Sequence, residues 1–457
     1  MDNLAVISIP GFSRSMLGAN TPHLNRLIDD GFATVLDNIL PAVTCSVQTS
    51  ILTGVTPARH GIVANGWFFR DLNEVWLWRQ SEGLVEAETV YQAAKKLDFG
   101  FTCLKHFWWY NMATSADIHV TPRPVYHADG RKEPDIYARP TGISEELQRE
   151  FGAFPLFKFW GPGASLPATE WIAKTGLYLI EKYNPTLSLI YLPHLDYDQQ
   201  RYGPDDSRIP GEVMALDKIL GSLITPLREK GREVLILSEY DIQAASKPVH
   251  LNRILRQCGW LEVICNATGE LLDFGGSAAF AVADHQIAHI YIKDPALIAD
   301  VKKKLEQSEG IDKVFDDSGK KEAGLDHPRS GELVALAADQ YWFTYYYWLD
   351  DNLAPDFARC VDIHRKPGYD PVELLVNPDM KFPRLAIAAK VLQKKLGMRY
   401  LMNVIGLDAD LVKGSHGRPP VSDEAAPVII SSAKSGERNR FHVCDLKQFM
   451  LDRIFKS

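Results

Sequence analysis

The sequence predicts an α/β protein built on a mostly parallel β-sheet with helices on both faces, together with a smaller inserted α+β domain. The first observation is that short apolar runs rich in β-branched residues alternate with segments of helical spacing. The second is that polar residues gather in the loops beside these runs. Such alternation is typical of a parallel sheet whose crossovers are helices. The runs are LAVISI (4–9), TLSLIYL (186–192), EVLILS (233–238) and APVIISS (426–432).

The segments between these strands are expected to be helices. In TPHLNRLIDDGF (21–32), Thr21 is the expected N-cap, Pro22 the first helical residue and Gly31 the residue past the end. Helical spacing recurs in 169–185 and 211–231, whereas PHLDYDQQRYGPDD (193–206) is expected to be a polar loop. Because ligands bind at the carboxyl ends of strands in such sheets, we expect a functional site there.

The chain of 457 residues is too long for one ordinary core. Residues 261–383 mix strands with a helical run and are predicted to form an inserted α+β cap domain. The core is then discontinuous, with residues 1–260 and 384–457 on either side of the insertion. Within the core, the aromatic-rich segment 67–168 is expected to supply part of the packing and part of a pocket wall.

Charge and cysteine content narrow the classes of partner. The formal net charge of −8 argues against nucleic-acid polymers and anionic membranes as general partners. The six cysteines include no CxxC pair, so neither a zinc ribbon nor a disulfide framework is expected. The N-terminus is acidic with a short apolar run, and no stretch approaches membrane-spanning length. We expect a cytoplasmic protein without a membrane partner, and the oligomeric state stays open.

A hydroxyl-rich stretch, NILPAVTCSVQTSILTG (38–54), raises the question of function. Thr44 follows an apolar approach and precedes a helical segment. It is either the cap of a helix that starts near Cys45 or a nucleophile at the end of a strand. This stretch alone favours the cap, because capping threonines far outnumber catalytic ones.

Four segments together resemble the type I phosphodiesterase / nucleotide pyrophosphatase family of the alkaline phosphatase superfamily: 41–71, 195–206, 234–242 and 413–420. The resemblance implies an alkaline-phosphatase-like fold and hydrolysis of phosphodiester, pyrophosphate or related phosphoryl and phosphonate bonds. It assigns Thr44 as the nucleophile and Asn65 as an amide that donates to a phosphoryl oxygen. It also implies a small phosphate ester or nucleotide-like molecule as the substrate.

The resemblance further implies two metal ions, usually zinc, held by three Asp and three His residues. Asp196 and His416 match this pattern, and Glu239 is a carboxylate in place of Asp. Gln200 stands where a His is expected; Pro10 and Tyr240 replace an Asp and a His. The implied cofactor is a divalent metal, most simply zinc, with one or two ions on Asp196, His416, Glu239 and Gln200, although zinc prefers N and S donors.

Other polar residues are candidates to compensate for the replaced ligands. Arg365 and Lys366 would bind a phosphate where a metal has gone, or else belong to a solvated loop, and the two interpretations are balanced. The further candidate ligands are His194, Asp198, Asp241, Asp284, His285, His289 and His364.

Three functions are consistent with this pattern. The first is a metal-dependent hydrolase of phosphoryl bonds with a threonine nucleophile. The second is a catalytically impaired ligand-binding or scaffold protein that retains the fold, favoured by the replaced ligands. The third is a phosphotransferase or isomerase related to phosphoglycerate mutases, which ranks last because those enzymes need a richer metal site.

Overall fold

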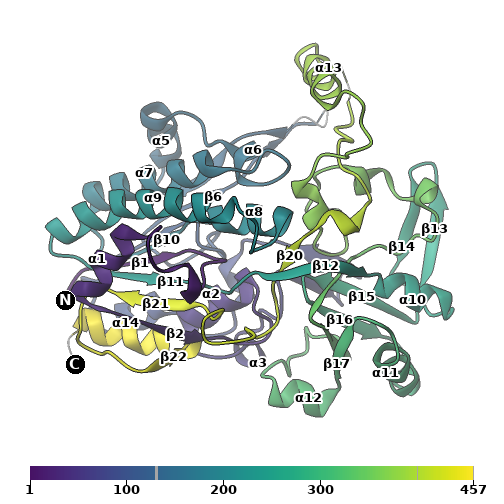
Figure 1. Ribbon diagram of the computed structural model, residues 1–457, viewed down its shortest axis with the longest axis horizontal. Helices are drawn as coiled ribbons and strands as arrows, with labels where there is room; N and C mark the ends of the chain where they lie inside the picture. Colours follow the sequence, from purple (N-terminus) through teal and green to yellow (C-terminus); the bar gives the residue numbers. More distant parts are fainter. Residues whose placement is uncertain (129–131, 399, 456–457) are drawn as a thin grey trace.

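The structure, a computed structural model, describes residues 1–128, 132–398 and 400–455. A nine-stranded sheet forms its centre (Figure 1). The strands, in spatial order, are β22 (Arg440–His442), β2 (Phe32–Asp37), β21 (Val428–Ser431), β11 (Glu233–Leu237), β1 (Leu4–Ser8), β10 (Leu187–Tyr191), β5 (Cys103–His106), β6 (Ile118–Pro122) and β9 (Ile136–Arg139).

The middle of this sheet is parallel. Strand β1 pairs in parallel with both neighbours, so that Leu4 lies opposite Leu187 of β10 and Glu233 of β11. Strands β5 and β6 continue the parallel order, whereas β21 and β9 run antiparallel to their neighbours. The predicted α/β class with a mostly parallel sheet is confirmed, although the APVIISS strand enters it antiparallel.

Helices cover both faces, because alternate residues of each strand point to opposite sides. Ala5 and Ile7 pack with helices α1 (Pro22–Asp30), α7 (Leu166–Tyr183) and α9 (Ile209–Glu229). Leu4 and Val6 pack on the other side with α2 (Thr44–Thr53), α4 (Val90–Leu97) and α14 (Leu446–Phe455). Burial on both faces explains why these strands are continuous apolar runs.

A second, four-stranded antiparallel sheet lies beside the large one and is built from β15 (Ala279–Asp284), β16 (Ile287–Ile292), β18 (Leu333–Ala337) and β17 (Ile311–Phe315). Strands β19 (Gln340–Phe343), β12 (Gln243–Val249) and β20 (Gly414–Ser415) form a small third sheet. The division into a core (1–260 and 384–457) and a cap domain (261–383) stays a prediction.

The remaining elements connect these layers. The two-stranded pairs are β3 (Gly66–Phe69) with β4 (Glu74–Leu77), β7 (Val125–Tyr126) with β8 (Lys132–Glu133), and β13 (Glu262–Asn266) with β14 (Gly269–Asp273). The other α-helices are α3 (Pro57–His60), α5 (Ile143–Phe151), α6 (Leu156–Phe159), α8 (His194–Tyr202), α10 (Leu251–Gln257), α11 (Ile298–Glu306), α12 (Asp317–Glu322) and α13 (Pro383–Lys395). Short 3-10 helices span Arg14–Met16, Glu82–Leu84, Pro295–Leu297, Asp351–Leu353, Asp356–Arg359, Pro371–Leu374, Ala409–Leu411 and Val443–Asp445.

One local expectation is wrong. The expected polar loop after β10 is largely the helix α8, and its polar side chains are buried: Gln199 donates to the main-chain oxygen of Gly11, and Arg201 donates to that of Leu374. The expectations for α1 are confirmed, since Thr21 is its N-cap residue, Pro22 its first residue and Gly31 its C-cap. The Thr21 hydroxyl accepts a bond from Gly18 N instead of from the helix.

No helix in the described ranges has both the length and the apolar character that a bilayer crossing requires.

Candidate functional site

Thr44 is the first residue of α2, at the carboxyl-terminal edge of the large sheet. Val43 is the N-cap and no side chain caps the helix, so the capping interpretation of Thr44 is wrong. Its hydroxyl lies 3.0 Å from the hydroxyl of Tyr240, which follows β11. The side chain therefore faces a tyrosine from another loop instead of its own helix.

Asp196, on α8, lies next to this pair. Tyr240 donates to Asp196 Oδ1 at 3.4 Å, and Gln200 Nε2 donates to Asp196 Oδ2 at 2.8 Å. His416 Nε2 lies 4.0 Å from Asp196 Oδ1. The structure thus brings together Thr44, Asp196 and His416, with Tyr240 between them.

A column of four rings, in which the His285–His416 pair is tilted, lies beside Asp196. The ring of Tyr240 lies 3.6 Å from His416, His416 lies 3.7 Å from His285, and His285 lies 3.6 Å from Tyr369, centroid to centroid. Tyr369 donates to Gln200 Oε1 at 2.9 Å, and Gln200 in turn donates to Asp196. Hydrogen bonds therefore connect both ends of the column to the Asp196 carboxylate. Burial lowers the pKa of both histidines well below the ordinary value, so both are neutral at physiological pH.

Glu239 lies just after β11, next to Tyr240 in the chain, and is fully buried. Its Oε1 accepts bonds from Ser8 and from Gln48, the latter at 2.7 Å. Burial raises the pKa of Glu239 to about 8 and that of Asp196 to about 7. Near neutral pH, Glu239 is therefore mostly protonated and Asp196 is close to half-protonated.

Asn65 is held by Asp284, at the end of β15. The Asn65 main-chain N and Nδ2 donate to the two oxygens of Asp284 at 2.7 and 3.0 Å, and its Oδ1 accepts from Cys45 N at 3.0 Å. Asp284 also bonds to His285 Nδ1 at 2.7 Å. His285 has a φ of 62°, which is uncommon for a residue other than glycine and places its ring in the column.

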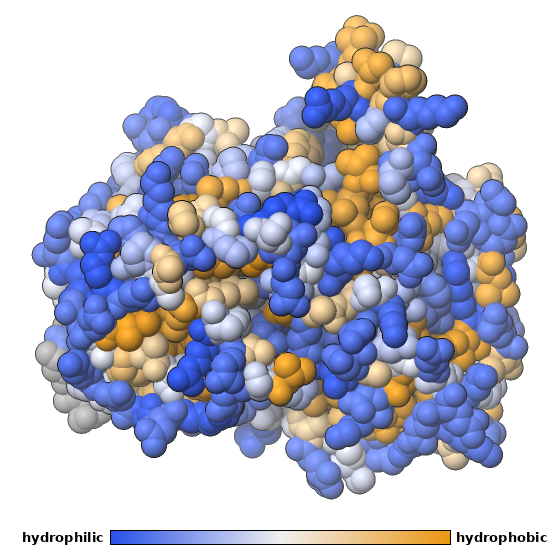
Figure 2. Space-filling model, viewed as in Figure 1, coloured by the Kyte–Doolittle hydropathy of each residue, from blue (hydrophilic) through white to orange (hydrophobic). Residues whose placement is uncertain are grey.

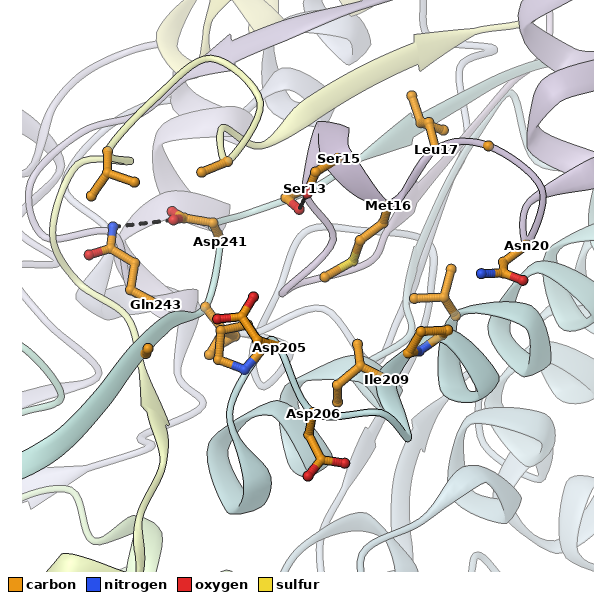
Figure 3. A pocket seen from close by; sticks show the side chains of 18 of the residues that line it. Ser13, Ser15, Met16, Leu17, Asn20, Asp205, Asp206, Ile209, Asp241 and Gln243 are labelled. Atoms are coloured by element: carbon orange, nitrogen blue, oxygen red, sulfur yellow. Dashed lines mark hydrogen bonds between the residues drawn. The ribbon is translucent and has the colours of Figure 1, made fainter.

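Asp241, the first of the proposed compensating residues, lines a separate cavity of about 720 Å³ (Figure 3). Gln243, which also lines this cavity, donates a hydrogen bond to Asp241 at 3.2 Å. Burial raises the pKa of Asp241 to about 6. Thr44, Asp196 and His416 are not among the residues that line this cavity.

The other three compensating candidates have partners of their own. Lys366 is buried, and its Nζ lies 2.7 Å from both Asp370 Oδ2 and Glu373 Oε1. Arg365 is half-exposed and pairs with Asp362, and the ring of His364 lies against Tyr126. A phosphate bound to Lys366 would have to displace a buried carboxylate.

The donor set does not fit a pair of zinc ions. In the ranges that the structure describes, no three His, Cys, Asp or Glu side chains are arranged to hold a metal ion. At this centre Asp196 and His416 are the ordinary donors, while Gln200 and Tyr240 form hydrogen bonds and the Glu239 oxygen accepts from Ser8 and Gln48. Structural and catalytic zinc sites take three or four protein donors, so the implied ligand set is incomplete here.

Restoring the replaced imidazoles should create zinc binding. In a Gln200→His/Tyr240→His variant, two imidazoles would join Asp196 and His416, which gives the four donors of a tetrahedral site. We expect about one zinc per chain in this variant and substoichiometric zinc in the wild-type chain, measured by elemental analysis after dialysis against zinc. Gln199→His, one position away on α8, is the control. Stoichiometric zinc in the wild-type chain would contradict the conclusion that its donor set is incomplete.

Comparisons with known proteins identify the family and the fold of the chain. The family model described as type I phosphodiesterase / nucleotide pyrophosphatase matches residues 4–370. An uncharacterised pyrophosphatase/phosphodiesterase of Schizosaccharomyces pombe is 24% identical over 278 residues, which are 57% of this chain and 47% of that protein. The matched part thus spans about half of this relative's length.

Two solved structures share the fold over nearly the whole chain. Murine ectonucleotide pyrophosphatase / phosphodiesterase 5 is 13% identical, with a TM-score of 0.58, over 99% of this chain and 95% of its own. Phosphonoacetate hydrolase from Sinorhizobium meliloti 1021 is also 13% identical, with a TM-score of 0.60, over 99% and 96%. Because the family model matches most of its length, the chain belongs to the type I phosphodiesterase / nucleotide pyrophosphatase family, whose members are hydrolases.

Proposed function

We propose that this chain hydrolyses a phosphoryl bond of a small phosphate or phosphonate ester and that Thr44 is the nucleophile. The observation that carries the proposal is the contact of the Thr44 hydroxyl with Tyr240, which leads on to Asp196. A hydroxyl at a helix N-terminus that is bonded to a proton-accepting chain is arranged as an activated nucleophile.

The residues present supply a route for the proton. Thr44 Oγ attacks phosphorus, a Thr44–phosphorus ester forms and the bond to the leaving group breaks. The hydroxyl proton passes to the oxygen of Tyr240, which gives its own proton to Asp196. Asp196 suits this role, because burial raises its pKa to about 7 and a group with a pKa near the working pH is an effective base. The leaving group departs as its oxyanion. Water then attacks phosphorus and breaks the Thr44–phosphorus ester, its released proton neutralises the leaving group, and the proton held on Asp196 returns through Tyr240 to Thr44 Oγ.

Solved neighbours suggest which substrates to test first. A murine ectonucleotide pyrophosphatase / phosphodiesterase 5 variant is in complex with AMP, and the Sinorhizobium phosphonoacetate hydrolase is in complex with phosphonoformate. Nucleotide phosphodiesters and small phosphonates are therefore the first classes to offer this chain. A requirement for a divalent metal, although implied by the family, has weaker support because of the incomplete donor set.

A second candidate function is ligand binding without turnover. The observation that favours it is the column of Tyr240, His416, His285 and Tyr369, which packs against Asp196 and leaves Thr44 buried. A substrate must displace part of this column to reach the hydroxyl of Thr44. If the column does not open, the chain retains the fold but not the chemistry.

Trapping the covalent intermediate tests the two candidates directly. The wild-type chain is incubated with bis-p-nitrophenyl phosphate, with and without added divalent metals, and acid-quenched samples are mapped by peptide mass spectrometry. The proposed function predicts release of p-nitrophenol and a phosphoryl adduct on the peptide that contains Thr44. An adduct on another residue would overturn the role of Thr44. AMP binding by calorimetry without turnover of any substrate would support the second candidate.

A further inference from the structure

Helix α13 stands away from the body of the molecule. It spans Pro383–Lys395 and projects at the top of Figure 1, above the loops that lie near β12 and β20. None of its residues whose burial is described is buried. Its 13 residues make a helix of about 20 Å, and a helix of that length is marginal in water unless it packs against something.

One face of this projection is apolar and open to solvent. Leucines recur seven residues apart at 385 and 392, and Phe382, Ala389 and Leu396 fall on the same face because their spacing alternates between three and four. The exposed fractions are 69% for Phe382, 68% for Leu385, 57% for Leu392 and 66% for Leu396. Figure 2 shows apolar residues gathered on this projection. We call Phe382, Leu385, Ala389, Leu392 and Leu396 the α13 stripe.

The opposite face explains how the helix is held. Ile387 lies about half a turn away from the stripe and packs against the core cluster that contains the second sheet. Lys390 Nζ donates to Leu401 O at 2.5 Å and to Asn403 Oδ1 at 2.6 Å. The helix is therefore fixed to the molecule by one side, and the stripe points outward.

The charge around the stripe has one sign. Residues 380–407 contain no Asp or Glu, although the whole chain has a formal net charge of −8. Arg384 and Lys395 flank the stripe on one side, whereas Lys390 lies toward the face that holds the helix. The basic residues of this segment are Lys381, Arg384, Lys390, Lys394, Lys395 and Arg399.

We propose that α13 binds the surface of an anionic lipid bilayer and lies in its interface with the α13 stripe buried. An apolar face beside basic side chains is the pattern of helices that bind there. A second copy of α13 is a poorer partner, because it would set two rows of like charges side by side. The net charge of the whole chain is negative and argues against membranes in general, whereas the charge of residues 380–407 is positive.

Vesicle sedimentation tests the proposal with the full chain. Vesicles of phosphatidylcholine alone are compared with vesicles of phosphatidylcholine mixed with phosphatidylglycerol. We expect binding to the anionic vesicles that weakens with added salt, and an affinity at least about tenfold lower for Leu385→Ser/Leu392→Ser. Arg384→Gln/Lys395→Gln is expected to lose most of the preference for the anionic lipid.

The matched control is Leu97→Ser/Phe99→Ser, which removes apolar side chains that are 65% and 99% exposed elsewhere on the molecule. This variant should bind the anionic vesicles as the wild-type chain does. Failure of the wild-type chain to bind, or equal loss in the control, would overturn the proposal. So would a dimer in analytical ultracentrifugation that the Leu385→Ser/Leu392→Ser variant dissociates, because a second copy would then cover the stripe.

Discussion

The Thr44→Ala variant is expected to hydrolyse a phosphodiester at least about 10³-fold more slowly than the wild-type chain. Without the hydroxyl there is no oxygen to form the ester, and Tyr240 loses its partner at 3.0 Å. The remaining interactions of Tyr240 with Asp196 and with the ring of His416 are unchanged by the substitution. Initial rates with bis-p-nitrophenyl phosphate, measured over a range of concentrations, separate kcat from KM.

Thr49→Ala is the matched control for this measurement. Thr49 lies on the same helix, is equally buried, and donates to Cys45 O at 2.7 Å. We expect its kcat to stay within a few-fold of the wild-type value, because its hydroxyl faces its own helix. A Thr44→Ala variant as active as Thr49→Ala would remove Thr44 from the chemistry. A Thr44→Ser variant should retain most of the activity, since it keeps the hydroxyl.

The second large effect is on stability. Lys366→Met is expected to lower the free energy of unfolding by about 3–5 kcal/mol, measured by chemical denaturation at neutral pH. The Lys366 ammonium neutralises Asp370 and Glu373, each 2.7 Å away, and all three side chains are almost completely buried. Removing the cation leaves two carboxylates without their counter-charge in a site where Trp160 also donates to Glu373.

Arg365→Met serves as the control in the same loop. Arg365 pairs with Asp362 but is 53% exposed, so its loss should cost no more than about 1 kcal/mol. In the triple variant Lys366→Met/Asp370→Asn/Glu373→Gln, part of the stability should return, because no uncompensated charge remains. Equal destabilisation by Lys366→Met and Arg365→Met would show that the buried charge cluster is not what makes Lys366 important.

The strands were predictable because buried strands are continuous apolar runs that can be recognised in the local sequence. Each run of β-branched and aliphatic residues, such as that of β1, requires cover on both faces, and this requirement alone indicates a parallel sheet between helices. The helix α8 was not predictable in the same way. Its Gln199 and Arg201 are typical of a loop until distant backbone oxygens are available to accept their hydrogen bonds.

The centre of the candidate site was predictable only in part. The family motifs marked Thr44, Asp196 and His416, and the structure places these three near one another. Tyr240 stands where the resemblance implies a His, and nothing in its local sequence indicates a stacked ring. Tyr369 had no local signal at all.

Local patterns along the chain are enough to predict the fold class, the family resemblance and the residues at the end of the sheet, because burial periodicity and motif spacing are local properties. The contacts that those residues make depend on the folded arrangement of distant segments. His416 and Tyr369 come from segments far from Tyr240 along the chain, and the column exists only because the second sheet brings His285 against them. Contacts of this kind depend on packing between distant segments, and local sequence patterns do not predict them.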